Sequence, residues 1–439
     1  MVRQLFPISA LLLGSALLLF AGGINSLLLP VRGTSEGFSA ASLGLLGTGW
    51  AIGYVLGCWW TPRLVGRVGH VRSFGVMSSF AGVALLMSLL FLTPYVWVPL
   101  RGLSGFCFAG AAMIVESWLS ERADATSRGK VFGVYTMVNL GASTAGQLVL
   151  TTGDTSGYLF FVLGAIFYSL ALVPTAISSS VSPRPLVSVK LDLRALWRNS
   201  PVAVFGVFCV GISNSAFGTL AAVYADRAGL ALASLALFAS LPVLAGALTQ
   251  VPVGFLSDRF DRRKVLLGVA FLALAVDMVF LVLQPEDRML NLVLSATFGA
   301  AIYAMYPVII AHANDHADDG HFIQTSGGLL MIFGMGSIFG PAVAGFAMSG
   351  VGQQGLFLTT AAAHLGLILF VMVRVAIRAP VAEEEKSDFV MAPSARGATP
   401  ETAALAVGEE ELGEEAGDDE AAAEKSEDAE SEPRDPVAP

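Results

Sequence analysis

Long apolar runs alternate with short polar connections along most of this chain. Runs such as 8–29 and 355–373 have about the 20 residues that an α-helix needs to cross a bilayer. Because hydrocarbon offers backbone N–H and C=O groups no partner, each run is expected to form a helix. We place twelve spans at 8–29, 42–61, 73–93, 97–119, 131–151, 157–178, 201–224, 232–256, 265–284, 290–312, 322–348 and 355–378. The pattern predicts an all-α membrane protein with 12 transmembrane helices.

The composition agrees with a chain that is mostly embedded in lipid. Mean hydropathy is +0.70, and only 13% of the residues are charged. The three cysteines, Cys58, Cys107 and Cys209, all fall inside apolar runs. They fit small packing residues better than a disulfide framework, and their spacing is not that of a metal site.

Basic residues occur in alternate connections, which predicts an orientation. If the N-terminus is cytoplasmic, the outer connections hold only Arg32, Arg227 and Arg288, and almost all other Arg and Lys residues of the spanning region lie inside. Positive charge marks cytoplasmic loops. We therefore expect a multi-pass protein of the inner (plasma) membrane with both termini in the cytoplasm.

The C-terminal stretch 379–439 differs sharply from the rest. It holds more than half of the 34 acidic residues and few large apolar ones. Such a composition is typical of disorder. We expect an acidic cytoplasmic tail, which either solubilises the protein or acts as a regulatory or partner-binding arm.

Weak internal repetition divides the spans into two halves. Gly23-Ile24-Asn25-Ser26 in the first span resembles the sequence GISNS at 211–215 in the seventh, and glycines at the ends of the second and eighth spans also correspond. The stretch between the halves is polar and basic. The domain prediction is an N-terminal six-helix bundle at 1–178, a cytoplasmic linker at 179–200, a C-terminal six-helix bundle at 201–378 and the tail at 379–439.

Two loop motifs resemble those of the major facilitator superfamily. The sequence GFLSDRFDRRK at 254–264 resembles the family's G-x-x-x-D-R-x-x-R-R-K, and GCWWTPR at 57–63 resembles a degenerate copy, with Thr61 in place of the aspartate. Arg101-Gly-Leu-Ser-Gly resembles the family's fourth-helix motif. Two further motifs resemble the YcaD-like bacterial subgroup: Glu116-Ser-Trp-Leu119 followed by Arg128-Gly129, and Tyr306-Pro307 followed by Asn314-Asp315.

The resemblance implies two parallel six-helix repeats around a central site, and secondary transport by alternating access. It also implies a cytoplasmic gate motif in which charge-assisted bonds break and re-form. The residues carried over to that motif are Gly57, Arg63, Arg67, Gly254, Asp258, Arg259, Arg262 and Arg263. A purely topological role for these arginines is compatible with the gate.

Three ionisable residues inside spans are candidates for proton coupling or gating, because such groups are costly in lipid. Arg101 either acts in proton movement and gating or extends to the outer interface. Glu116 either carries a proton or forms a fixed gate contact with Arg63 or Arg67. Asp277 lies mid-span, and in this family that helix is peripheral, so bonding to a neighbouring helix is its alternative role.

Neutral polar side chains within apolar runs are candidates for lining a substrate cavity. Such groups also serve as ordinary hydrogen-bonding contacts between helices. The candidates are Asn25, Asn139, Gln147, Asn214 and Gln250, and the resemblance favours Asn25 and Asn214 because the first and seventh spans face the cavity in this family.

The sequence from His312 to His321 holds several His and Asp residues, which suggests a metal site. Its position at a helix end favours an ordinary polar turn, so we expect no metal and no cofactor. The main hypothesis is a monomeric transporter, not an enzyme, that moves a small solute with a proton gradient and binds no nucleic acid. The alternatives are a membrane metal-dependent enzyme at 312–321, or a transporter-like sensor that signals through its tail.

Overall fold

The computed structural model describes residues 9–122, 128–177, 193–316 and 322–377, together with Lys386, Phe389 and residues 398–402. Within them there is no β-strand. The helices are α2 (Ser9–Ser35), α3 (Ala40–Val68), α4 (His70–Leu90), α5 (Pro94–Arg122), α6 (Arg128–Leu148), η2 (Val149–Thr152), α7 (Leu159–Ile177), α8 (Leu193–Asn199), α9 (Pro201–Arg227), α10 (Leu232–Arg259), α11 (Arg262–Leu283), α12 (Arg288–Asn314), α13 (Phe322–Val351) and α14 (Gly355–Ile377).

Each predicted span overlaps one long helix, so the all-α prediction is confirmed. Among the described residues, eleven helices are long and apolar enough to cross a membrane. The one expected span not among these eleven is 131–151, which corresponds to α6. This helix has 21 residues but includes Asn139 and Gln147 and is therefore less apolar. The short helix α8 lies in the stretch predicted as a linker.

Capping residues fix where several of the helices begin. Ser200 accepts a hydrogen bond from the N–H of Ala203 at 3.3 Å, and Pro201 occupies the first turn, where its missing N–H is no loss. Asp287 caps α12 by accepting from the N–H of Leu290 at 2.7 Å. Gly69, with φ of 83°, makes the turn from α3 into α4 in a conformation that favours glycine.

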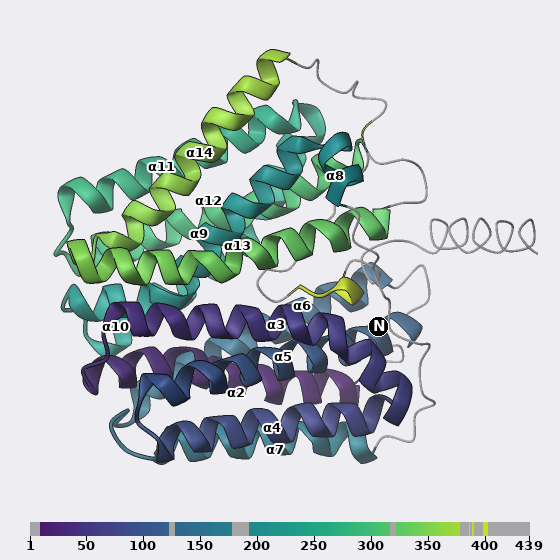
Figure 1. Cartoon of the computed structure of the whole chain (residues 1–439), viewed down its shortest axis with the longest axis vertical. Helices are drawn as coiled ribbons and strands as arrows, with labels where there is room; N and C mark the ends of the chain where they lie inside the picture. The colour runs from purple at the N-terminus through teal and green to yellow at the C-terminus, as the bar shows by residue number, and fades with distance from the viewer. Residues whose placement is uncertain are drawn as a thin grey trace, which may run out of the picture.

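The helices form two bundles with the same internal packing. In the first bundle, α2 packs against α6 and α7, α3 against α5, and α4 against α5 and α7. In the second bundle, α9 packs against α13 and α14, α10 against α12, and α11 against α12 and α14. Figure 1 shows the first bundle, in purple and blue, below most of the second, in teal and green. The matched pairs confirm a repeated six-helix unit.

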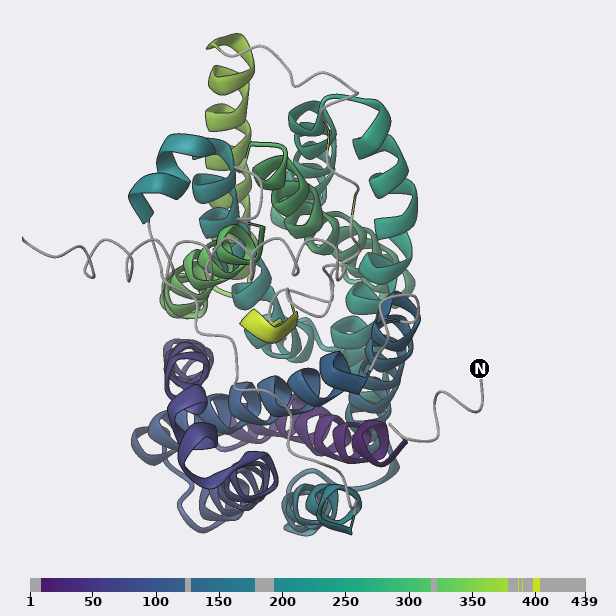
Figure 2. The same ribbon diagram turned by 90° about the vertical axis from the view of Figure 1, so that its right-hand side faces the viewer.

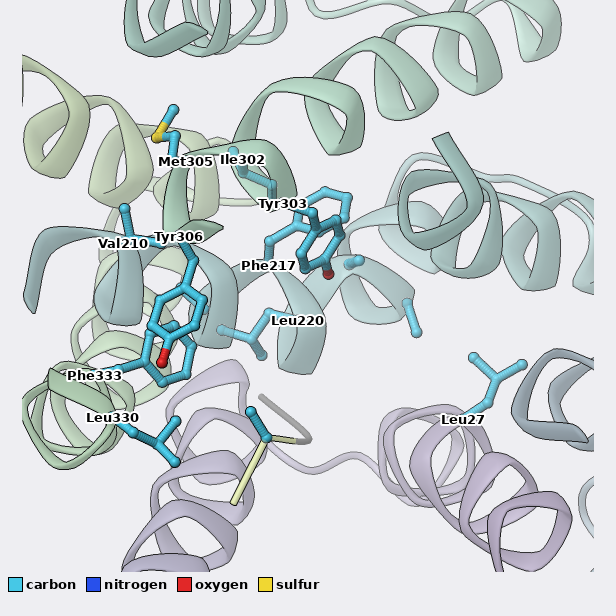
Figure 3. Close-up of a cluster of buried hydrophobic side chains, with 14 of the residues drawn as sticks. Leu27, Val210, Phe217, Leu220, Ile302, Tyr303, Met305, Tyr306, Leu330 and Phe333 are labelled. Atoms are coloured by element: carbon cyan, nitrogen blue, oxygen red, sulfur yellow. The ribbon is translucent and has the colours of Figure 1, made fainter. Parts of the chain in front are cut away.

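Aromatic side chains fill the core of the second bundle. The rings of Phe280 and Phe357 stack with centroids 3.9 Å apart, and Tyr224 meets Phe357 edge-on at 4.8 Å. Figure 3 shows buried side chains of α9 and α12, including Phe217 and Ile302, gathered beside those of α13. Close packing of this kind makes the second bundle resist deformation.

Large apolar side chains are exposed on the outer faces of the bundles. The exposed fractions reach 74% for Leu248, 70% for Val282 and 60% for Phe346. A water-soluble protein rarely exposes so much apolar surface, whereas contact with lipid tails accounts for it.

The bundles touch most closely where α3 begins and α13 ends. A Cβ placed on Gly345 of α13 would lie 2.6 Å from the carbonyl oxygen of Ala40 and 3.0 Å from the Cα of Gly44. The N–H of Ala41 donates to Ser349 Oγ at 3.0 Å, and Thr48 Oγ1 donates to the carbonyl of Ile338 at 2.7 Å. The two helices therefore meet backbone to backbone at this end.

We call the other end of the bundles, where α3 and α10 finish, the basic end, because arginines of both loop motifs lie there. Residues 398–402, named here the tail segment, lie between the two bundles towards this end, as the yellow turn in Figure 2 shows. The tail segment is buried, with Thr399 only 1% exposed. Within the stretch 379–439, which was predicted to be disordered, these described polar residues find hydrogen-bond partners inside the protein.

The contact between α3 and α13 predicts a specific cross-link. In a variant lacking the three native cysteines, Ala41→Cys and Ser349→Cys should form a disulfide readily. Adding Gly345→Leu should slow that reaction by roughly fivefold or more, because overpacking of this size costs about 1–3 kcal/mol. The measurement is the rate of cross-linking on addition of an oxidant.

Gly350→Leu is the matched control, since a Cβ on Gly350 would meet nothing within 4 Å. Equal slowing by both leucines would show that the close approach at Gly345 is not what holds these ends together.

Candidate functional site

Glu116 lies at the centre of a buried polar cluster between the bundles. Its side chain extends from α5 and is 2% exposed. Tyr135 Oη of α6 donates to Glu116 Oε1 at 3.1 Å, and Thr402 Oγ1 donates to Oε2 at 2.8 Å. Thr399 Oγ1 also donates to Oε2. Three hydroxyl groups, two of them from the tail segment, thus satisfy this carboxyl group.

The expected pairing of Glu116 with Arg63 or Arg67 is not what the structure shows. Among the described residues no cation forms a salt bridge with Glu116. Arg63 is exposed, with its guanidinium 4.4 Å from the ring centre of Trp59 and bonded to that residue's carbonyl. Arg63 thus has its partner, Trp59, at the surface.

An apolar pocket with an empty volume of about 470 Å³ lies beside this cluster, between α3 and α13. Trp50 and Tyr54 of α3 stack on one side, with ring centroids 5.1 Å apart. Tyr54 Oη donates to the carbonyl of Ala398 in the tail segment. The remaining lining residues are Ala51, Val55, Cys58, Leu330, Met331, Phe333, Gly334, Ser337 and Pro400. Both bundles and the tail segment therefore contribute to the pocket.

Arg101 lies in α5, as Glu116 does, but far from it. The two residues are 15 positions apart, which is about 22 Å along a helix axis. Arg101 is 8% exposed. The sequence placed both residues among the candidates for coupling or gating, and the structure does not bring them together.

Asp277 belongs to a separate polar chain that crosses the second bundle. Thr360 Oγ1 of α14 donates to Asp277 Oδ1 at 2.6 Å, and His364 Nδ1 lies 2.7 Å from Oδ2. Ser213 Oγ of α9 lies 2.8 Å from His364 Nε2. All four side chains have zero exposure. The sequence reasoning missed His364, although a single histidine inside the apolar run 355–373 was a usable signal.

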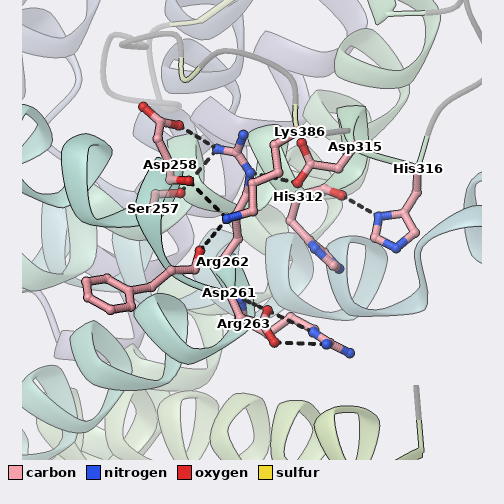
Figure 4. A network of polar contacts seen from close by, with 10 residues as sticks. Ser257, Asp258, Asp261, Arg262, Arg263, His312, Asp315, His316 and Lys386 are labelled. Atoms are coloured by element: carbon pink, nitrogen blue, oxygen red, sulfur yellow. Dashed lines mark hydrogen bonds and ion pairs between the residues drawn. The ribbon is translucent and has the colours of Figure 1, made fainter. Parts of the chain in front are cut away.

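The second-half loop motif forms a network at the basic end (Figure 4). Arg262 is 1% exposed and bonds Asp315 Oδ2 at 2.7 Å, Ser257 Oγ at 3.2 Å and Asp258 Oδ1 at 3.3 Å. Arg262 thus ties the start of α11 to the ends of α10 and α12. Arg259 instead lies over the ring of Phe255, 4.3 Å from its centre.

Asp261 and Arg263 pair at the start of α11. Arg263 Nη2 lies 2.9 Å from Asp261 Oδ2, and the backbone N–H of Arg263 donates to Oδ1 at 3.0 Å. Burial acts to raise the pKa of Asp261, but the side-chain and backbone bonds from Arg263 outweigh it and hold that pKa below its usual value. Asp261 is thus charged at neutral pH.

Three of the predicted cavity amides have unsatisfied atoms, and one of these atoms is Gln147 Oε1. Neither amide atom of Asn214 has a hydrogen-bond partner among the described residues, and Asn25 Oδ1 has none either. Both residues are buried, at 1% and 2% exposed. Unpaired amide atoms in so apolar a setting favour a site that water or a solute fills.

The other predicted cavity residues are buried or half-buried between helices. Asn139 Oδ1 accepts from Ser15 Oγ at 2.7 Å, and Gln147 Nε2 lies 3.5 Å from Ser26 Oγ, so both join α6 to α2. Gln250 is 6% exposed in α10. The motif glycines allow close contacts: Gly57 with Phe106 of α5, and Gly254 with Phe389.

The described part of the 312–321 stretch does not gather metal ligands. His316 Nδ1 lies 2.9 Å from the carbonyl oxygen of His312, and the two rings meet edge-on. Among the described residues no group of three or more His, Cys, Asp or Glu could hold a metal ion. Asp318, Asp319 and His321 lie outside the described residues.

Comparison with known proteins points to one family. The model of the Major Facilitator Superfamily matches residues 11–321 and, in an overlapping match, 203–409. A protein of Salmonella arizonae named "Uncharacterized MFS-type transporter YcaD" is 25% identical over 370 residues, which cover 83% of this chain and 95% of that protein. A YcaD of Salmonella newport matches to the same extent.

Solved structures show the same fold. The nucleoside transporter NupG superposes with a TM-score of 0.70 at 15% identity, covering 84% of this chain and 98% of that one. A bacterial homologue of the human lysosomal transporter Spinster, in an inward-facing and occupied conformation, gives 0.69 at 14% identity, covering 87% and 98%.

Paired six-helix bundles with a pocket between them define a multi-pass membrane transporter. The chain belongs to the major facilitator superfamily, and its resemblance to the YcaD proteins is confirmed. Family membership also answers the alternative of a metal-dependent enzyme at 312–321: the protein is a transporter and not an enzyme.

The buried pair of Asp277 and His364 predicts a non-additive effect on stability. Asp277→Leu should lower the free energy of unfolding by about 3 kcal/mol, because His364 and Thr360 lose their common acceptor. Adding His364→Leu should recover much of that loss, since an apolar pair leaves fewer buried polar groups unpaired. Thermal unfolding of the purified variants measures both effects, and strictly additive losses would contradict the pairing.

Proposed function

We propose that this protein is a secondary active transporter that moves a small organic solute by alternating access and couples it to a proton gradient. The observation that carries the proposal is Glu116, a buried carboxyl group beside the inter-bundle pocket whose partners are all hydroxyl groups. A carboxylate removed from water must gain donors, a cation or a proton. Glu116 is therefore suited to bind and release a proton as a solute enters and leaves.

The packing between the bundles supports alternating access. The bundles meet backbone to backbone near Gly44 and Gly345, whereas the pocket lies nearer the basic end. If the two bundles rock against each other as units, the contact near Gly44 and Gly345 would separate. The space around the pocket, nearer the basic end, would close. The structure corresponds to the state that is open towards the basic end.

The basic end is assigned to the cytoplasm. Arg63, Arg67, Arg259 and the buried pair of Arg262 and Arg263 lie there, and positive charge marks the cytoplasmic side of membrane proteins. We infer from this that both termini lie in the cytoplasm and that the protein belongs to the inner (plasma) membrane. We propose that it works as a monomer, because each copy contains both bundles.

The pocket walls indicate the class of solute. Trp50, Tyr54 and Phe333 offer apolar and aromatic surface. Glu116, which bonds the tail segment at the edge of the pocket, offers an acceptor. A solute with an apolar or aromatic part and a hydroxyl or amine donor would satisfy both.

Glu116→Gln tests the proton-coupling role. A solute is first found by screening metabolites and drugs for those that raise the unfolding temperature of the purified protein. In proteoliposomes the variant should lose accumulation driven by a pH gradient by about tenfold or more, because glutamine keeps the shape but cannot exchange a proton. Exchange of labelled for unlabelled solute should persist.

Glu121→Gln, on the same helix but exposed, is the control for this test and should accumulate solute as the wild type does. Full accumulation by Glu116→Gln would remove Glu116 from the coupling mechanism.

Arg101→Ala is a second test of coupled transport. A buried guanidinium in a span is costly unless it is used, so we expect the variant to reach the membrane at normal levels but to lose coupled flux. Quantitative blotting and the same flux assay measure the two effects. Wild-type flux in Arg101→Ala would show that the arginine has no part in transport.

A further inference from the structure

We infer that the tail segment is a built-in inhibitor, which occupies the inter-bundle site and holds the transporter in the state open to the basic end. The segment, Ala398-Thr399-Pro400-Glu401-Thr402, comes from a stretch whose composition predicts disorder, yet all five residues are buried. Its effect on transport depends on the proposed function, whereas its presence in the site does not.

The segment has a sequence suited to a compact turn. Thr399 N–H donates to Thr402 Oγ1 at 2.7 Å, and Thr402 N–H donates to the carbonyl of Thr399 at 2.9 Å. Pro400 follows Thr399, in the arrangement that favours the start of a helical turn. The turn places both threonine hydroxyl groups on one side, where they reach the same oxygen of Glu116.

The segment contacts both bundles. Its threonines bond Glu116 of α5, and the carbonyl of Ala398 accepts from Tyr54 of α3, so three residues are fixed to the first bundle. Pro400 lines the pocket together with Leu330 and Gly334 of the second bundle. It therefore fills space that a solute would need to reach Glu116.

Lys386 and Phe389, which precede the tail segment in the chain, attach the tail to the second bundle. Lys386 Nζ donates to the carbonyls of Asp258 at 3.0 Å and Phe260 at 2.8 Å, where a cation meets the end of the α10 helix dipole. The ring of Phe389 packs against Gly254. A Cβ placed on Gly254 would lie 2.5 Å from the Cδ1 atom of Phe389. The tail is thus bound along the gate motif before it enters the space between the bundles.

These contacts exclude two steps of the transport cycle at once. A solute cannot bond Glu116 while the two threonines do, and the bundles cannot close at the basic end while the segment lies between α3 and α13. A group that binds only one conformational state shifts the population towards that state. Release of the segment is therefore required for turnover.

Cys58 offers a readout that needs no solute and no flux. It lines the pocket with Pro400, whereas Cys107 and Cys209 are buried and can be replaced by alanine. In this background, Thr399→Val with Thr402→Val should raise the rate at which a charged, membrane-impermeant methanethiosulfonate modifies Cys58 by about tenfold or more, because two hydrogen bonds to a carboxylate are lost. Deletion of 386–439 should raise it at least as much.

Thr399→Ser with Thr402→Ser is the matched control, since it keeps both hydroxyl groups, and it should leave the rate unchanged. Pro400→Cys should form a disulfide with Cys58 on mild oxidation of the full chain, seen as a cross-linked peptide by mass spectrometry. An unchanged labelling rate in both the valine pair and the deletion, or no cross-link, would overturn the inference.

Transport is measured separately once a solute is known. The valine pair should raise initial flux several-fold. Faster Cys58 labelling without any flux would support the segment's position and contradict the proposed transport, whereas flux that is equal in the valine pair and the wild type would contradict inhibition.

Discussion

The exclusion of water is the constraint on which the structure depends. Because lipid satisfies no polar group, the backbone is helical throughout the spanning segments, and charged side chains are kept only where another group meets them. Asp277 with Thr360 and His364 shows this inside the second bundle, and Arg262 with Asp315 shows it at the basic end. Glu116 obeys the same rule with hydroxyl groups alone.

The two bundles share one helix-packing scheme, but their polar groups differ in role. The second bundle has an aromatic core and a buried polar chain that fix its helices to one another. The first bundle carries Glu116 next to the pocket, where its partners are Tyr135 of the same bundle and two threonines of the tail segment. The contacts that can exchange, those of Glu116, therefore lie on the first-bundle side of the inter-bundle space. The second bundle forms the more rigid opposite side.

The fold was predictable from the sequence, because the length of the apolar runs, the internal repetition and the loop motifs can be read from short stretches of sequence. The identities of the important single residues were also visible: Glu116, Asp277 and Asn214 stand out against apolar neighbours. Their partners were not visible. His364 lies 87 positions from Asp277 and Thr399 lies 283 positions from Glu116. The low content of large apolar residues predicted disorder for 379–439. Composition cannot identify a short polar turn whose hydroxyl groups bond one buried carboxyl group.

The covalent connection of the tail segment to its own site changes how strong that contact has to be. A tethered group near its site acts at an effective concentration on the order of millimolar. A contact of only millimolar intrinsic affinity would then occupy the site about half of the time, and the attachment of Lys386 and Phe389 to the second bundle shortens the tether further. A solute or partner present at micromolar concentration would need an affinity about a thousandfold higher than that of the tail segment to displace it. The tail therefore sets a minimum affinity that a scarce solute must have in order to be transported.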